Sequence, residues 1–118
     1  MIKITIHRSN FREIISKGNF IILHLHKQEN GDFIICDEIS INIKDIKSRD
    51  SFVSALTNLN YPTDRMDAIR NNYDLVRDGV AEDKTEEYTK EYLEMQAWRK
   101  KAKELANEII EEIERQHG

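Results

Sequence analysis

The segment from residue 83 to residue 116 contains neither proline nor glycine and consists mostly of strong helix formers. Folded as one helix, it would be about 50 Å long, which exceeds the diameter of a domain of this size. The sequence therefore predicts a long C-terminal amphipathic helix. We expect its N-terminal half to pack on the core and its C-terminal half to project.

Apolar residues recur along this segment at alternating spacings of four and three, a pattern typical of a helix that packs against another helix. Only Arg99 interrupts the series, and Trp98 stands beside it. Leu93, Leu105 and Ile110 widen the seam, so part of it can pack on the protein's own sheet. Tyr, Trp and Arg are enriched where interfaces gain most of their energy, so we predict an interaction surface. Its residues are Tyr88, Tyr92, Met95, Trp98, Arg99, Ala102, Ala106, Ile109 and Ile113.

The N-terminal part of the chain has the patterns of β-strands. Isoleucines at alternate positions of segment 2–7 predict a strand with one buried face. Two further strands are predicted at about residues 20–27 and 32–43, which are rich in β-branched and aromatic residues. Between the first two strands, Ser9 is placed to cap a short helix that Gly18 ends. The prediction is a three-stranded antiparallel sheet with one short N-terminal helix.

The Asn30-Gly31 pair marks a hairpin between the second and third of these strands. A three-residue loop that ends at Gly31 pairs Leu25 with Ile35 and keeps the apolar residues on one face. We therefore prefer this register to that of a two-residue turn. The same register places His24 opposite Cys36.

From about residue 50 the pattern becomes helical. Asp50 can cap a first helix, which the Tyr61-Pro62 pair ends, because the residue before a proline disfavours helical geometry. Thr63 can cap a second helix that closes at Gly79. These two segments predict a helical pair, or helical hairpin.

The elements together predict an α+β fold, and 118 residues suffice for one domain with its own core. We expect a single domain, residues 1–118, in three parts. These are residues 1–46, mainly β with one short helix, residues 50–79, the helical pair, and residues 83–116, the long C-terminal helix.

Charge and composition exclude several classes of protein. A formal net charge of −4 argues against a general nucleic-acid-binding protein. A single cysteine cannot form an internal disulfide, so nothing indicates an oxidising compartment. The sequence lacks an apolar run of about 18 residues, the length of a membrane span. We expect a cytoplasmic protein that does not enter a membrane.

His24, His26 and Cys36 are the main candidates for a metal site or a reactive thiol. The two histidines share a strand face, and zinc accepts nitrogen and sulfur ligands. Their spacing, however, is not that of a zinc motif, and a cysteine in the middle of a strand is usually a small core residue. We therefore expect no metal, no cofactor and no catalytic residue. A metal- or thiol-dependent activity is kept as an alternative.

The basic island Trp98–Lys103 is the best candidate for contact with nucleic acid, since an aromatic ring can stack on a base while cations meet phosphates. Glutamates at positions 91, 94, 104 and 108 flank it at helical spacings and lower the local positive field. Ion pairing within the helix is the preferred interpretation. A nucleic-acid-binding accessory protein is the second alternative.

The runs Tyr61–Tyr73 and Tyr92–Lys103 contain an Asn-Asn-Tyr sequence and a Met-Gln-Ala-Trp-Arg sequence. Over residues 50–110 the chain resembles small uncharacterised proteins of phage and prophage gene clusters. The resemblance implies a virion-associated or assembly role, in the host cytoplasm or in the virion, and no catalytic residues. We therefore expect a non-enzymatic interaction or assembly module, either a homo-oligomer formed through the C-terminal helix or a binder of another protein.

Overall fold

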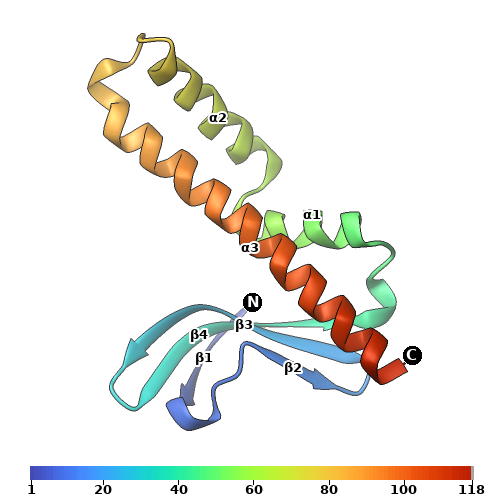
Figure 1. The fold of residues 1–118 in the computed structure, drawn as a ribbon. Helices are drawn as coiled ribbons and strands as arrows, with labels where there is room; N and C mark the ends of the chain where they lie inside the picture. Colours follow the sequence, from blue (N-terminus) through green and yellow to red (C-terminus); the bar gives the residue numbers. More distant parts are fainter. Residues whose placement is uncertain (118) are drawn as a thin grey trace. The chain divides into compact units, whose positions relative to one another are not determined.

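The computed structural model describes residues 1–117 and shows an α+β fold (Figure 1). Within the described residues there are a four-stranded antiparallel sheet and three α-helices, the last of them long. The chain divides into two compact units. The sheet unit comprises Met1–Lys47 and the chain from Ile109 onward, and the helical unit comprises Ser48–Glu108. The single domain expected above stays a prediction.

The sheet has the strand order β1-β4-β3-β2, and every neighbouring pair is antiparallel (Figure 1). The alternation of isoleucines predicted the first strand correctly. A tight turn at Gly31 joins the two long central strands. The strands are β1 (Ile2–His7), β2 (Ile14–Lys17), β3 (Phe20–Asn30) and β4 (Phe33–Asn42).

The prediction of three strands and a short N-terminal helix is wrong. Ser9 lies in a single 3-10 turn, Arg8–Asn10, and the rest of the expected helix contains strand β2, which pairs with β3. A helix as short as the expected one has little stability of its own. The adjacent β-branched residues Ile14 and Ile15 are stabilised more by pairing with the open edge of β3 than they would be in a short helix. Gly18, at φ +62°, belongs to the β2–β3 turn rather than to a helix end.

The predicted hairpin register is also wrong. Asn30 pairs with Phe33 across a two-residue turn, and a bulge between Leu25 and Gln28 shifts the ladder by one residue. His26 lies in this bulge with φ 57°, a left-handed backbone angle that is uncommon outside glycine. The bulge accommodates one extra residue on β3. Apolar residues of β3 and β4 therefore pair, although the turn has two residues and not the three that we expected. His24 consequently lies opposite Glu38, not opposite Cys36.

Apolar side chains are buried on both faces of the sheet. Ile21, Leu23 and Leu25 alternate along β3 and are at most 4% exposed. The last turns of the long helix belong to this unit, and Ser16 Oγ donates a hydrogen bond of 2.8 Å to Gln116 Oε1. On the other face, the ring of Phe11 lies 5.9 Å from that of His24.

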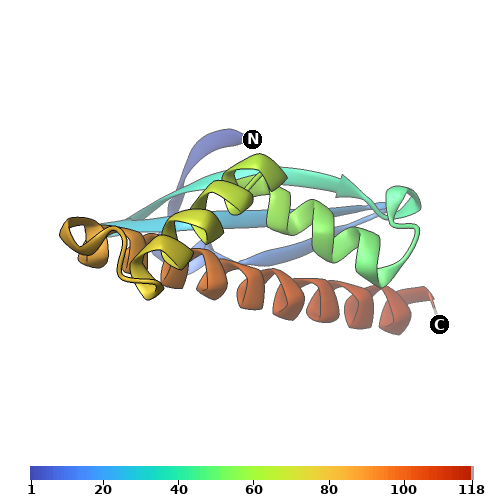
Figure 2. The same cartoon turned by 90° about the horizontal axis from the view of Figure 1, so that it is seen from above.

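The helical unit contains the predicted pair and most of the predicted long helix. The elements are α1 (Arg49–Asn60), α2 (Thr63–Arg77) and α3 (Thr85–His117), whose last residues belong to the sheet unit. Ser48, rather than Asp50, caps α1 by a reciprocal capping box with Ser51. Thr63 is the first residue of α2, whose N-cap is Pro62. Figure 2 shows α2 lying alongside the first half of α3.

Candidate functional site

The predicted interaction surface on α3 is largely occupied within the single chain. Met95, Ala102, Ala106 and Ile109 are all 0% exposed, so none of them is available to a partner in this fold. Tyr88 and Ile113 are half-buried. The apolar seam that suggested an interface is therefore mainly a core seam.

Two aromatic residues of the predicted surface also have partners within the helical unit. The ring of Tyr92 stacks on the ring of Tyr73 from α2, with centroids 4.0 Å apart and planes 5° from parallel. The indole Nε1 of Trp98 donates to the backbone oxygens of Leu56 and Thr57, each at 3.2 Å, at the end of α1. These side chains join α3 to its neighbouring helices.

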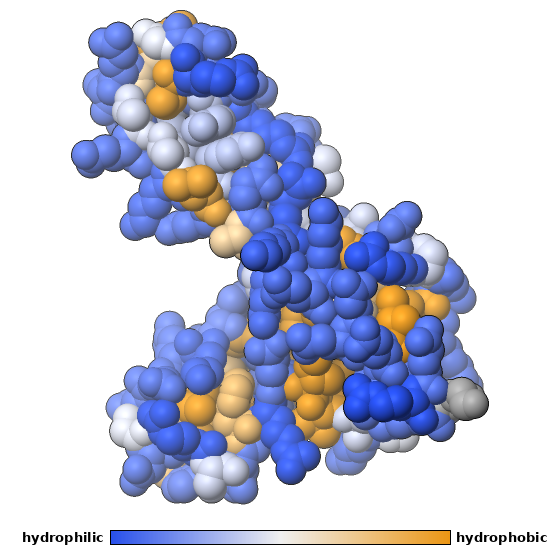
Figure 3. Space-filling view, viewed as in Figure 1, coloured by the Kyte–Doolittle hydropathy of each residue, from blue (hydrophilic) through white to orange (hydrophobic). Residues whose placement is uncertain are grey.

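The opposite side of α3 carries an exposed leucine. Leu93 is 59% exposed and lies nine residues, about two and a half helical turns, from the buried Ala102, so the two side chains point in opposite directions. It lines an open, mainly apolar depression that also includes Thr89. Figure 3 shows that hydrophobic surface over α2 and the first half of α3 is confined to small patches among hydrophilic side chains. The sequence pattern places Leu93 in the widened seam, and only the burial of Met95 and Ala102 shows that Leu93 lies outside it.

Residues on either side of Leu93 form a short stripe on the same face of the helix. Thr89 and Ala97 each lie four residues from it, and Glu86 and Lys100 each lie seven residues from it. Both spacings keep side chains on one helical face. We call this set the Leu93 face, and its members are Glu86, Thr89, Leu93, Ala97 and Lys100.

His24, His26 and Cys36 are engaged separately. The His24 ring is 4% exposed, with Nδ1 2.7 Å from the backbone oxygen of Arg12 and Nε2 3.0 Å from Glu38 Oε2. Nδ1 of His26, by contrast, lies 2.7 Å from Asp37 Oδ2. Among the side chains that the structure describes, no group of three from His, Cys, Asp or Glu could hold a metal ion.

The thiol of Cys36 lies in an environment that disfavours a thiolate. Cys36 is 1% exposed and lies opposite Ile4 of β1. Burial raises its pKa, and the negative charges of Asp37 and Glu38 raise it further. Since the thiolate is the nucleophile, these surroundings oppose the reactivity that a catalytic cysteine needs.

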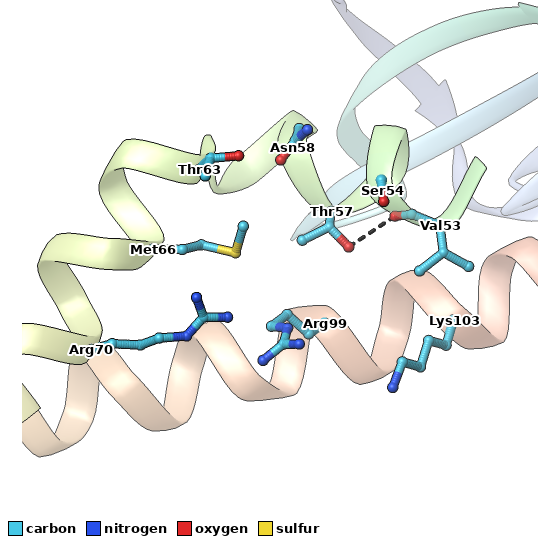
Figure 4. A pocket seen from close by; sticks show the side chains of 9 residues that line it. All are labelled: Val53, Ser54, Thr57, Asn58, Thr63, Met66, Arg70, Arg99 and Lys103. Atoms are coloured by element: carbon cyan, nitrogen blue, oxygen red, sulfur yellow. Dashed lines mark hydrogen bonds between the residues drawn. The ribbon is translucent and has the colours of Figure 1, made fainter. Parts of the chain in front are cut away.

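Two cations of the basic island line a pocket within the helical unit. Arg99 and Lys103 from α3 meet Arg70 from α2 there, around a volume of about 210 Å³ (Figure 4). We call it the cationic pocket. Two of these cations, Arg99 and Lys103, belong to the basic island recognised in the sequence. Arg70 could not be predicted as a member of this site, because nothing local in the sequence connects α2 with that part of α3.

Comparison with protein-family models, curated proteins and solved structures finds no match for this chain. The resemblance to small phage and prophage proteins therefore stays a prediction. Across the described part of the chain, no helix is both long and apolar enough to cross a membrane.

Proposed function

We propose that this protein is a non-enzymatic interaction or assembly module that associates with a second copy of itself through the Leu93 face of α3. The observation that carries the proposal is the 59% exposure of Leu93 on the side of α3 opposite its fully buried seam. An exposed leucine surrounded by polar side chains gains free energy when a partner covers it.

The order of residues along the Leu93 face suits an antiparallel pair of identical helices. A twofold axis through Leu93 places each Leu93 beside its copy and Thr89 beside Ala97 of the second copy. The same axis places Glu86 beside Lys100 of the second copy. Each of these contacts then joins apolar side chains, small side chains or side chains of opposite charge, as a self-complementary surface requires.

The proposed contact is small. One helix face meeting its copy buries less than the ~1,200 Å² of a standard stable interface, so the association is weak and depends on concentration. A contact on a twofold axis closes with two copies, so the proposed unit is a dimer. This fits the phage-related assembly role that the resemblance implies, in the cytoplasm or in a virion.

Analytical ultracentrifugation over about 10 µM to about 1 mM protein tests the proposal. The wild-type sedimentation coefficient should rise with concentration. Leu93→Asp should weaken association at least roughly tenfold, because it removes apolar contact and places two carboxylates together.

Leu75→Asp is the matched control, since Leu75 is an exposed leucine (42%) on α2, outside the Leu93 face. It should associate like the wild type. A wild-type protein that stays monomeric throughout this range, or equal effects of the two substitutions, would contradict the proposal.

A further inference from the structure

The cationic pocket concentrates positive charge in an acidic protein. The chain has 22 acidic and 18 basic side chains, yet the pocket lining includes three cations and no carboxylate. Like charges that share a confined site repel one another, and an anion among them converts that repulsion into attraction. A bound anion would explain this local excess of positive charge.

The cations keep most of their hydrogen-bonding capacity for a ligand. Arg99 donates one hydrogen bond of 3.2 Å to Gln96, which leaves most of its five N–H groups available. Arg70 has a carboxylate neighbour, Asp67, at 3.6 Å, on the exposed surface of α2. In Figure 4 the side chains of Arg70 and Arg99 extend from α2 and α3 into the same region.

Neutral hydrogen-bonding groups complete the lining. Ser54, Asn58 and Thr63 contribute hydroxyl and amide groups, and Thr57 directs its own hydroxyl hydrogen to the backbone oxygen of Val53 at 2.8 Å (Figure 4). Thr63 is also the first residue of α2, whose N-cap, Pro62, makes no side-chain capping bond. The positive end of this helix dipole therefore adds to the field of the cations.

The size and remaining lining of the pocket restrict the ligand further. A volume of about 210 Å³ is below the ~300 Å³ at which sites for larger organic ligands begin. Met66 and Val53 add an apolar side, and the side chain of Met66 points toward Thr57 (Figure 4). Guanidinium groups match the oxygens of a phosphate in geometry and in charge.

We propose that the cationic pocket binds the terminal phosphate of a small phosphomonoester. Arg70, Arg99 and Lys103 hold the oxygens of the dianionic phosphate group. Ser54 and Thr63 supply further hydrogen bonds to the phosphate. Met66 and Val53 contact the short organic part of the ligand. The proposal does not depend on self-association, since none of these residues belongs to the Leu93 face.

Isothermal titration calorimetry on the full chain tests the proposal with glycerol phosphate, inorganic phosphate and a single-stranded oligonucleotide. All titrations use the same ionic strength and about pH 8, where the phosphate esters are dianionic. Glycerol phosphate should bind saturably to one site, and inorganic phosphate should bind the same site more weakly. Arg70→Gln, Arg99→Gln and Lys103→Gln should each weaken binding about tenfold or more.

Arg77→Gln is the matched control, because Arg77 is an arginine of α2 that pairs with Asp74 and Asp78 away from the pocket lining. Circular dichroism checks that each variant is folded. If a glutamine variant is not folded, the conservative substitutions Arg70→Lys and Arg99→Lys replace it. Three results would overturn the proposal. The first is that neither phosphate ligand binds saturably. The second is that Arg77→Gln weakens binding as much as the substitutions in the pocket do. The third is that the oligonucleotide binds more tightly than glycerol phosphate, which would indicate a nucleic-acid site.

Discussion

Within residues 1–116, His24 and Thr57 are the two buried polar residues, and both are hydrogen-bonded. Burial of an unsatisfied polar group costs free energy, so each partner is part of what holds the residue in place. Both ring nitrogens of His24 face oxygen atoms. These oxygens belong to the backbone of Arg12 and to the carboxylate of Glu38. His24 thus acts as a structural link between β3, β4 and the backbone at Arg12, which accounts for its burial without a metal.

Asp37 provides a pH-dependent contribution to stability at the residue scale. The hydrogen bond from His26 lowers the pKa of Asp37 below its ordinary value, and the charge of Lys3, 3.8 Å away, lowers it further. A lowered folded-state pKa stabilises the fold above the unfolded pKa, about pH 4 for aspartate. This contribution is lost as pH falls through the folded-state value.

Asp37→Asn should therefore reduce the free energy of unfolding near neutral pH and have a smaller effect at about pH 3. Urea denaturation followed by circular dichroism at the two pH values measures the difference. Asp32→Asn, at a turn residue in no ion pair within the described chain, is the matched control and should lower the free energy of unfolding less than Asp37→Asn near neutral pH. A loss for Asp37→Asn that is equal at both pH values would show that the ionised carboxylate contributes nothing.

At the scale of elements, α3 has one buried face and one exposed face. Its buried face includes small residues such as Ala102 and Ala106, which allow close packing, and the indole of Trp98, which donates to the end of α1. Its exposed face carries Leu93 between residues of opposite charge. A heptad-like pattern gives the direction of the apolar stripe, but it does not distinguish a stripe that packs inside the chain from one that packs on a copy.

The charges that flank Leu93 allow a test of how two copies of α3 meet. Glu86→Lys or Lys100→Glu alone should weaken self-association by roughly tenfold, because each creates two like-charge contacts in the dimer. The double variant exchanges the two charges and should restore association to near the wild-type level. Sedimentation at low salt measures all four proteins, since salt screens such pairs. Failure of the double variant to recover would exclude the proposed antiparallel register.

At the scale of the whole molecule, self-association and ligand binding would use different surfaces of one helix. The Leu93 face points away from the buried seam, whereas Arg99 and Lys103 lie toward α1 and α2 in the helical unit. A dimer formed through the first surface leaves the pocket residues out of the contact. The two proposals can therefore fail or succeed separately.

Disulfide trapping tests the geometry of the whole dimer. In the proposed dimer, Thr89 lies beside Ala97 of the second copy, whereas the two copies of Thr89 are about 12 Å apart along the helix axis. A mixture of Thr89→Cys and Ala97→Cys proteins should give a covalent dimer under mild oxidation faster than Thr89→Cys alone. Wild-type protein is the control, since its one cysteine is buried. Equal rates for the mixture and for Thr89→Cys alone would contradict the twofold axis through Leu93.

The sequence by itself determined the elements whose signals are local. The long helix follows from a segment without proline or glycine, the break between α1 and α2 from Tyr61-Pro62, and the strands β1, β3 and β4 from alternation and β-branched residues. The α+β class follows from these elements. Each of these signals acts between residues a few positions apart, so no knowledge of the rest of the chain is needed.

Tertiary structure alone decided which surfaces meet. The segment around Ile14 became a strand because β3 offered an open edge, and the bulge at His26 set the register that separates His24 from Cys36. The same competition for burial placed Met95 inside and Leu93 outside on one helix. It also brought Arg70 to the pocket that Arg99 lines. Residues distant in sequence contribute to each of these outcomes, because burial and pairing free energies depend on the neighbours that the folded chain supplies.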